Sequence, residues 1–471
     1  MRHSHDLIVI GAGAAGLTAA GGCAMLGLHV ALIERSAMGG DCLNTGCVPS
    51  KALLAAAHRA HEVAGAGTFG IVAGVTRIDF AAVRKHVQGA IAAIAPHDSV
   101  ERFEAMGVEV IRGDARLRDE RTVEVDGRRL SAPRIVLATG SRPAIPDVPG
   151  LRDGPFFTNE TIFDLDQLPE HLLILGGGPI AVELGQGFRR LGSRVTLIAK
   201  GALLARDDPE AAQVVIEQLR MDGVTIRTGA EAAGVAYGDG VTVTLADGER
   251  ISGSRLLVAA GRTPDFAGLG LERAGVRWTK DGIAVDARRR TSNPRIFAIG
   301  DARAGPRFTH ASGYEGTLCV LNIGLGLPSK AEYAALPHVT YSDPELAQVG
   351  LTEAEARGKH RNVSVWRADF AGNDRAVAEG DTRGFVKLVK AGRKVVGATI
   401  IGARAGELIL PWIMAVTGKH STFELAGLIL PYPTRSEASK AAAFAAHEAL
   451  VFHPLAKRWA RALARLRGGP K

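Results

Sequence analysis

The stretch "DLIVIGAGAAG" (residues 6–16) decides the first part of the fold, because a short apolar strand runs directly into three spaced glycines. Gly11, Gly13 and Gly16 form the pattern G-x-G-x-x-G between a predicted strand and a predicted helix. Such glycines let the backbone approach a pyrophosphate, which then lies at the helix N-terminus. The next predicted strand, "HVALIER", reaches Glu34, where a carboxylate accepts a hydrogen bond from a ribose hydroxyl. We therefore predict a dinucleotide-binding fold here.

The same pattern returns later in the chain and predicts a second dinucleotide-binding fold. The stretch "HLLILGGGPIAVELG" (residues 171–185) again joins an apolar strand to a helix through glycines. Its small residues follow the related pattern G-x-G-x-x-A, which dinucleotide-binding folds also use. The three small residues are Gly176, Gly178 and Ala181.

A downstream segment of each fold repeats as well. "IVLATGSRP" (residues 135–143) and "LLVAAGRTPD" (residues 256–265) both combine a strand, a glycine, a basic residue and a proline. This repetition implies two related folds, one nested inside the other along the chain. The strand in "PRIFAIGD" completes the first fold and ends beside a carboxylate, where ligands bind in such sheets. The predicted cofactor contacts in these segments are Gly261 and Asp301.

The second fold differs from the first at the residue that contacts the ribose. Ala199 lies twenty-three residues after Gly176, at the position where the first fold has Glu34. Lys200 follows directly, and Arg206 is close in sequence. Loss of the carboxylate removes repulsion against a 2′-phosphate, and a nearby cation attracts that phosphate. The sequence therefore favours NADPH over NADH; the alternative is that Lys200 is an ordinary exposed loop lysine.

Two of the four cysteines lie together in "GGDCLNTGCVPSKALL" (residues 39–54). On a regular helix, the Cα atoms of Cys42 and Cys47 would be roughly 8–9 Å apart, whereas a disulfide needs less than about 7 Å. If the two sulfurs bond, the helix must break between them, and Asn44 and Gly46 are suitable turn formers. The pair would then lie at the N-terminus of the next helix, where the helix dipole stabilises a thiolate.

This cysteine pair has three candidate uses: a redox couple, a structural metal site, or two buried free thiols. A zinc site needs four ligands, usually in two close pairs, but Cys23 and Cys319 lie alone and the chain has no C-x-x-C motif. No metal site is therefore predicted. A redox couple is favoured because the two dinucleotide sites supply a path for electrons. In this path NAD(P)H donates hydride, and FAD passes two electrons to the disulfide.

The composition is that of a globular protein with several domains. The 471 residues are 46% hydrophobic and 23% charged, with 58 glycines. The cysteines form no disulfide framework and no export signal is visible, so we predict a cytoplasmic protein. The whole chain has a net charge of +8, and residues 455–471 contain six basic residues and no acidic residue. Most of the excess positive charge therefore lies in this tail.

These motifs resemble the pyridine nucleotide-disulfide oxidoreductase family, in the group containing dihydrolipoyl dehydrogenase, glutathione reductase and mercuric reductase. The resemblance extends from about residue 6 to about residue 452, and "GGDCLNTGCVPSK" is close to the redox-active signature of the group. It implies that Cys42 meets the substrate and that Cys47 faces the flavin. It also implies that Lys51, one helical turn after Cys47, pairs with Glu183 near the flavin. The FAD contacts implied by the resemblance are Glu34, Gly113, Ala115, Thr139, Gly140 and Asp301.

The resemblance implies an α/β fold with two nested Rossmann-like dinucleotide-binding domains and a C-terminal α+β dimerisation domain. From about residue 336, four segments alternate apolar and polar residues as antiparallel strands do. The implied assembly is a homodimer with active sites shared between subunits. The predicted boundaries are residues 1–146 and 266–335 for the FAD-binding domain, 147–265 for the NAD(P)-binding domain, 336–452 for the dimerisation domain and 453–471 for a basic amphipathic tail.

The chain departs from the family pattern near its C-terminus. Dihydrolipoyl dehydrogenases and glutathione reductases have H-P-x-x-x-E there, in which the histidine accepts thiol protons and the glutamate orients it. This chain has "LPYPTRSE", so Tyr432 replaces the histidine while Glu437 is retained. With a pKa near 10, tyrosine is a poor base at neutral pH. Other histidines in candidate positions are His310, His338 and His447, for which an ordinary structural use is the simpler interpretation.

Three hypotheses for the function follow. The first is an NADPH-dependent reductase of a small disulfide or a soft metal ion, similar to mercuric reductase. Mercuric reductases also have tyrosine at the position of Tyr432. They carry a C-terminal cysteine pair, however, which this chain lacks. The second is a dihydrolipoyl dehydrogenase that uses NAD, against which Tyr432 and Ala199 argue. The third is a non-catalytic flavoprotein redox sensor or a membrane-docked electron-transfer partner.

The basic tail is predicted to form an amphipathic helix. Leu455, Trp459, Leu463 and Leu466 fall on one helical stripe, with the cations elsewhere. Such a helix either lies on an anionic membrane surface or packs its stripe against the dimer. No aromatic stacking platform is evident, so nucleic acid binding is not predicted.

Overall fold

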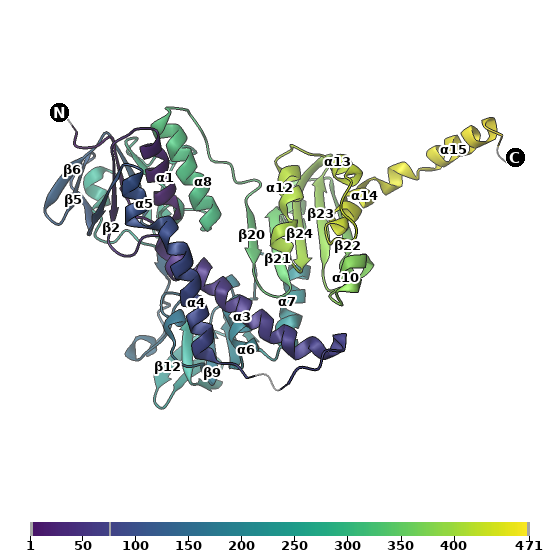
Figure 1. The fold of residues 1–471 in the computed structure, drawn as a ribbon, viewed down its shortest axis with the longest axis horizontal. Coiled ribbons are helices and arrows are strands. Elements are labelled where there is room, and N and C mark those ends of the chain that lie inside the picture. The colour runs from purple at the N-terminus through teal and green to yellow at the C-terminus, as the bar shows by residue number, and fades with distance from the viewer. Residues whose placement is uncertain (1–2, 75–76, 469–471) are drawn as a thin grey trace. The chain divides into compact units, whose positions relative to one another are not determined.

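In a computed structural model of the chain, residues 3–74 and 77–468 are described, and they form two compact units (Figure 1). The first unit runs to Leu203 and resumes from Asp222 to Glu332. The second unit contains Leu204–Met221 and the chain from Tyr333 onward. Among the described residues, no helix is both long enough and apolar enough to span a bilayer.

The first unit contains a five-stranded parallel sheet with the strand order β19-β7-β1-β2-β3. Every residue of β1 and β2 is buried, which explains their continuous apolar sequences, because parallel strands are covered on both faces. Helix α1 (Ala14–Met25) packs against α8 (Thr309–Cys319) beside this sheet. The predicted completion of the first fold by "PRIFAIGD" is confirmed, since β19 lies at one edge. The strands are β1 (Leu7–Ile10), β2 (Val30–Glu34), β3 (Val108–Arg112), β7 (Arg134–Leu137) and β19 (Ile296–Ala298).

A second parallel sheet in the same unit has the order β11-β10-β9-β15. Helix α6 (Pro179–Arg190) follows β9 as α1 follows β1, so the predicted repetition is present in the fold. The repeated downstream segments also pair with each other, because β8 (Ser141–Pro143) and β16 (Arg262–Pro264) form an antiparallel ladder. The sheet strands are β9 (His171–Leu175), β10 (Arg194–Ala199), β11 (Thr225–Thr228) and β15 (Arg255–Val258).

Smaller antiparallel sheets and further helices complete the first unit. The additional strands are β4 (Ala115–Leu117), β5 (Thr122–Val125), β6 (Arg128–Ser131), β12 (Ala232–Tyr237), β13 (Val241–Leu245), β14 (Arg250–Gly253), β17 (Trp278–Thr279) and β18 (Gly282–Ile283). The additional helices are α2 (Gly40–Asn44), α3 (Cys47–Gly65), α4 (Phe80–Ile94) and α5 (Val100–Ala105).

The second unit is built on a five-stranded antiparallel sheet with the order β20-β21-β24-β23-β22, which confirms the predicted antiparallel strands. Trp412, on α12, is fully buried in the core that covers this sheet. The strands are β20 (Pro337–Thr340), β21 (Glu345–Gly350), β22 (Val363–Asp369), β23 (Phe385–Ala391) and β24 (Lys394–Gly402). The helices are α7 (Pro209–Met221), α9 (Glu353–Lys359), α10 (Asp374–Ala378), α11 (Ala405–Leu408), α12 (Leu410–Val416), α13 (Thr422–Gly427), α14 (Glu437–Val451) and α15 (Pro454–Leu466).

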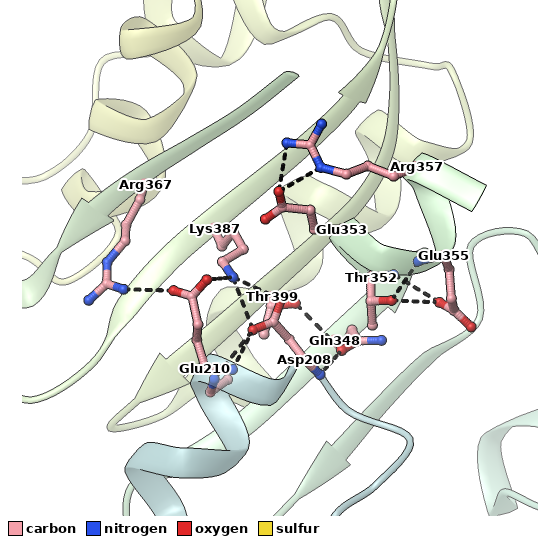
Figure 2. Close-up of polar contacts among 11 residues, drawn as sticks. Asp208, Glu210, Gln348, Thr352, Glu353, Glu355, Arg357, Arg367, Lys387 and Thr399 are labelled. Atoms are coloured by element: carbon pink, nitrogen blue, oxygen red, sulfur yellow. Dashed lines mark hydrogen bonds and ion pairs between the residues drawn. The ribbon is translucent and has the colours of Figure 1, made fainter. Parts of the chain in front are cut away.

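Lys387, on β23, is buried although it carries a charge. Its Nζ lies 3.0 Å from both carboxylate oxygens of Asp208 and 2.7 Å from Oε1 of Glu210 (Figure 2). Asp208 directly precedes α7 and is itself buried. A buried charge is tolerated only when it has partners of opposite sign, which Lys387 and Asp208 provide for each other. The ion pair therefore holds the start of α7 against the sheet of this unit.

We expect Lys387→Met to destabilise the second unit by about 3–5 kcal/mol, because it leaves Asp208 buried without its cation. The double variant with Asp208→Asn should recover part of this loss, since no buried charge then remains. Urea unfolding followed by tryptophan fluorescence measures the effect. Arg357→Ala is the matched control in Figure 2: it breaks an exposed pair with Glu353 and should cost less than about 1 kcal/mol. Equal costs for the two single variants would contradict the assignment.

Candidate active site

Cys42 lies in α2, and Cys47 is the first residue of α3. The two helices are separated by Thr45 and Gly46, and Gly46 has a non-helical φ of −125°. A Cβ atom on Gly46 would lie 2.9 Å from the backbone oxygen of Asp41, so this tight turn favours glycine. The predicted helix break between the cysteines is therefore confirmed. Both cysteines are half-buried thiols at the N-terminal side of α3.

The surroundings of Cys47 favour its thiolate form. A hydrogen bond from Cys42, another from Thr309 and the charge of Lys51 lower the pKa of Cys47 to about 6, although burial opposes this effect. The sulfur of Cys47 lies 3.3 Å from Oγ1 of Thr309, the first residue of α8. The same hydrogen bond to Cys47, together with burial, raises the pKa of Cys42 well above its usual range. At neutral pH the pair is therefore one thiolate, at Cys47, and one thiol, at Cys42.

Lys51 and Glu183 lie together, as the family resemblance implied. Nζ of Lys51 is 2.8 Å from Oε2 of Glu183, whose side chain is buried on α6. Lys51 also lies one turn after Cys47 on α3, and its charge contributes to the low pKa of that thiol. The contact agrees with the prediction, whereas the part that each residue plays in catalysis remains a prediction.

A network of hydrogen bonds and an ion pair to Asp41, which was not predicted from the sequence, holds α2 in place. Arg262, at the start of β16, lies 2.9 Å from Oδ2 of Asp41, the residue before Cys42. Nδ2 of Asn159 donates to Oδ1 of Asp41 at 3.0 Å, and Arg262 donates to Oδ1 of Asn159 at 3.2 Å. Arg262 is the basic residue of the repeated segment 256–265, so the repeat contained the signal. Its partners come from distant parts of the chain, which no local pattern reveals.

The first glycine motif forms a turn with no room for side chains. Gly11 has a φ of +104°, and a Cβ there would lie 2.3 Å from the carbonyl oxygen of Ala138. A Cβ on Gly16 would lie 1.8 Å from the carbonyl oxygen of Gly11. At Gly13, by contrast, a Cβ would meet nothing closer than 4.0 Å. The backbone is therefore packed tightly behind the turn and open at Gly13, as a pyrophosphate site requires.

Two residues beside this turn also fit a bound dinucleotide. Oγ1 of Thr139 is buried and has no hydrogen-bond partner among the described residues, which is rare for a buried hydroxyl. Asp301, after β19, accepts a hydrogen bond from Oγ of Ser141 at 2.6 Å. Thr139, Gly140 and Asp301 all follow strands of the first sheet at their carboxyl ends, where such folds bind ligands. These residues would hold FAD, which accepts hydride and delivers electrons to a disulfide when bound.

Glu34 has more protein contacts than the sequence predicted. Its Oε2 accepts the backbone N–H of Ala12 at 2.6 Å, and its Oε1 accepts the backbone N–H of Ser36 at 2.8 Å. Oε1 also accepts from Oγ of Ser36 at 3.0 Å. The carboxylate therefore ties the glycine turn to the end of β2, and Oε2 is the oxygen that keeps a lone pair for a ribose hydroxyl. Gly113, with a φ of +143°, donates its N–H to the backbone oxygen of Glu34 at 3.1 Å, and Ala115 begins β4 nearby in sequence.

The second glycine motif repeats the geometry of the first. Gly176 has a φ of +148°, and a Cβ there would lie 2.3 Å from the carbonyl oxygen of Ala259, the same distance as at Gly11. A Cβ on Gly178 would meet nothing within 4 Å, and Ala181 is fully buried. Gly261, with a φ of +117°, lies after β15. The turn at the second glycine motif, together with Gly261, would hold the nicotinamide dinucleotide.

Lys200 has a partner that the sequence did not predict. Its Nζ lies 2.6 Å from Oε1 of Glu231, and both side chains are exposed. An exposed ion pair of this kind contributes only about 0–1 kcal/mol, so a phosphate ligand can displace Glu231 at small cost. The pair is compatible with recognition of a 2′-phosphate by Lys200.

Tyr432 is 71% exposed, and its hydroxyl donates to Oδ2 of Asp374 at 2.7 Å. This hydrogen bond raises the pKa of Tyr432 above its ordinary value, which makes the tyrosine a still poorer base at neutral pH. Glu437 begins α14, and its Oε2 accepts the backbone N–H of Thr434 at 3.3 Å. Glu437 is therefore engaged with the backbone of its own helix start, and the contact of Tyr432 with Asp374 was not predicted.

The three other candidate histidines all have structural contacts. Nε2 of His338 lies 2.9 Å from Oδ1 of Asp207. Nε2 of His447 lies 2.9 Å from Oγ1 of Thr422, and burial lowers the pKa of His447. The ring of His310 stacks with that of Phe308 at a centroid distance of 5.3 Å. These contacts agree with the simpler structural interpretation.

Two family models match this chain and together cover most of it. The model described as pyridine nucleotide-disulphide oxidoreductase matches residues 5–316, and the model for the dimerisation domain of the same family matches residues 336–443. A mercuric reductase from Streptomyces lividans is 38% identical over 455 residues, covering 93% of this chain and 95% of that protein. A dihydrolipoyl dehydrogenase from Geobacillus stearothermophilus is 36% identical over 452 residues, with the same coverage.

Solved structures show the same architecture. LpdA from Mycobacterium tuberculosis superimposes with a TM-score of 0.86 at 28% identity, covering 94% of this chain and 99% of that one. The HOCl-induced flavoprotein disulfide reductase RclA from Escherichia coli, solved as a Cu(II) complex, gives a TM-score of 0.84 at 28% identity, covering 93% and 99%. The chain therefore belongs to the pyridine nucleotide-disulphide oxidoreductase family and is a flavoprotein oxidoreductase that uses FAD and a pyridine nucleotide and carries the family's dimerisation domain.

Proposed function

We propose that this chain is a reductase that uses NADPH, FAD and the Cys42–Cys47 couple to reduce a soft metal ion or a small disulfide. The observation that carries this proposal is the division of the pair into the Cys47 thiolate and the Cys42 thiol. Two electrons and one proton convert the S–S bond of the oxidised couple into this thiolate and this thiol. When the S–S bond re-forms, the two electrons pass to the acceptor.

The surroundings of Tyr432 favour a metal ion over a disulfide as the acceptor. A disulfide substrate must gain two protons as it becomes two thiols, so its reduction benefits from a positioned acid–base group. Tyr432 is a poor candidate for that group, because its hydroxyl is held by Asp374 and its pKa is raised. A soft metal ion takes up electrons without protons and binds readily to thiolates. A dihydrolipoyl dehydrogenase activity would require the missing base and is therefore the less favoured alternative.

An anaerobic substrate panel tests this proposal. The FAD-loaded enzyme is mixed with NADPH or NADH and with Hg(II), Cu(II), glutathione disulfide, lipoamide or a quinone. We expect the fastest turnover with NADPH and a thiol-binding metal ion, and loss of that turnover in Cys42→Ala. Turnover limited to lipoamide with NADH would refute the proposal in favour of a dihydrolipoyl dehydrogenase.

We also propose that Lys200 sets a preference for NADPH. Lys200→Glu should lower the ratio of kcat/KM for NADPH to that for NADH by about 10- to 100-fold, the usual value of one charge-assisted hydrogen bond. Steady-state kinetics with both coenzymes measure the ratio. Arg194→Glu is the matched control, because Arg194 is an exposed, ion-paired cation at the other end of β10 and should leave the ratio unchanged. A wild-type enzyme that prefers NADH would contradict the assignment.

We propose that the second unit forms the homodimer interface. It exposes several large apolar side chains near Tyr432, among them Ile429, which is 99% exposed. Such exposed apolar surface is typical of an interaction face. The exposed apolar residues of this stretch are Phe423, Leu428, Ile429 and Tyr432.

The basic tail forms α15, as predicted, and lies apart from the sheet of its unit (Figure 1). Leu455, Trp459 and Leu466 on its apolar stripe are all exposed. We propose peripheral contact of this helix with an anionic membrane surface, which cosedimentation with anionic and neutral vesicles would test. A cytoplasmic location remains part of this proposal.

A further inference from the structure

A basic pocket that no predicted cofactor contact lines lies in the first unit. It encloses about 590 Å³, within the range of roughly 300–1,000 Å³ that small-molecule sites occupy. Its walls come from β4, from the short strands β8 and β16, and from residues 266–280, including β17. The two glycine motifs and the cysteine pair do not contribute to it.

The pocket gathers more positive charge than the surrounding residues neutralise. Five of its lining residues are arginine or lysine, and Glu272 is its single lining acid. Arg118 forms an ion pair with Glu124, a carboxylate that it shares with Arg129. The other four have no hydrogen bond or ion pair to any carboxylate within the described part of the chain. These four cations are Arg116, Arg142, Arg273 and Lys280.

An exposed indole lies at the same pocket. Trp278 is 45% exposed, and its Nε1 donates to Oε1 of Glu272 at 3.1 Å, which fixes the ring orientation and engages one oxygen of the single lining carboxylate. Phe266 packs against the indole with a centroid distance of 4.9 Å and an interplanar angle of 56°. An oriented, partly exposed aromatic face beside several cations suits a ligand with both a planar ring and an anionic group.

We propose that this pocket binds a polyphosphate group, carried by a nucleotide or present as free inorganic polyphosphate. Among the described residues these four cations form no ion pair, and only Arg142 has a Coulombic interaction with a carboxylate, that of Glu160. Cations that line one pocket repel one another, and a multiply charged anion lowers this repulsion. Arginine and lysine are the side chains that bind phosphate oxygens most often, through charge-assisted hydrogen bonds. FAD and the nicotinamide dinucleotide are accounted for by the two glycine motifs, so the ligand of this pocket is a third phosphorylated molecule.

Calorimetric titration of the FAD-loaded protein tests this assignment. NADP⁺ is kept at saturating concentration so that the second glycine motif is occupied, and ATP or inorganic tripolyphosphate is added. We expect binding near one molecule per subunit, with an affinity that falls as salt rises. The double variant Arg273→Ala/Lys280→Ala should weaken binding by about 100-fold or more, since each charge-assisted hydrogen bond is typically a factor of about 10–100.

The control is Arg277→Ala, which removes an exposed cation from the same segment that does not line the pocket. It should leave binding, FAD content and thermal stability unchanged. Trp278→Leu separates the two sources of polyphosphate. The ligand is a nucleotide if the wild type binds ATP more tightly than tripolyphosphate and this difference is lost in Trp278→Leu. Equal binding of the two in both proteins identifies inorganic polyphosphate. The assignment is overturned if neither anion binds, or if the double variant and Arg277→Ala bind them equally.

Discussion

Replacing Cys47 by serine is expected to abolish turnover with every acceptor while FAD remains bound. The change removes the thiolate but leaves the glycine turns that would hold the cofactor intact. Wild-type protein with its cysteine couple reduced should show an ultraviolet thiolate signal that is present above pH 6 and is lost as pH falls through about 6, because the pKa of Cys47 is lowered to about 6. Cys47→Ser should lack this signal.

Two further variants make this prediction sharper. Cys42→Ser should also lose turnover, because no S–S bond can form, but should keep the thiolate signal, since a serine hydroxyl can still donate to Cys47. Thr309→Val removes a hydrogen bond to Cys47 and should shift the loss of the thiolate to a higher pH. Turnover that survives in Cys47→Ser, or a signal that disappears in Cys42→Ser, would show that the electrons follow another route.

Tyr432→His is expected to raise turnover with glutathione disulfide or lipoamide by about 10²–10⁴-fold, the usual contribution of a positioned general acid–base group. Histidine titrates near neutral pH, whereas the pKa of Tyr432 is raised above its ordinary value by Asp374. The rate at which NADPH reduces the enzyme should stay nearly unchanged, because that half-reaction does not use this residue. Stopped-flow measurement of the two half-reactions separates these effects.

Asp374→Asn is the matched control for this prediction. It weakens the hydrogen bond that holds the Tyr432 hydroxyl but introduces no group that titrates near pH 7. We expect no gain in disulfide turnover from it, and no gain with a metal ion from either variant. If Tyr432→His folds, binds FAD and still shows no gain with a disulfide, Tyr432 does not occupy the position of the base.

The sequence predicted those parts of the fold whose causes are local. The two strand–turn–helix motifs, their nested order and the antiparallel sheet of the second unit all follow from glycine spacing and hydrophobic patterning. The helix break at Gly46 followed from the reach of a disulfide, and the contact between Lys51 and Glu183 from the family resemblance.

The contacts that were missed join residues far apart in sequence. Thr309, whose hydroxyl lies against Cys47, is separated from it by 262 residues and belongs to no motif, although its neighbour His310 drew attention to the segment. Asp374 lies 58 residues before Tyr432, and only the folded unit shows that its carboxylate holds the tyrosine hydroxyl. The predicted partner of Lys200 was a phosphate, whereas Glu231 supplies a protein partner from a neighbouring element.

The pairing of β8 with β16 has a consequence for how this enzyme can be altered. The nested nucleotide fold leaves the first fold at one of these strands and returns at the other, and the N–H of Ala144 donates to the carbonyl oxygen of Gly261 at 2.9 Å. The two ends of the insertion are thus one hydrogen bond apart. A segment with adjoining ends can be exchanged for its counterpart from a relative without changing the distance that the host chain must span. We therefore expect that grafting this segment from a relative would change the proposed coenzyme preference without altering the chemistry proposed for Cys42 and Cys47.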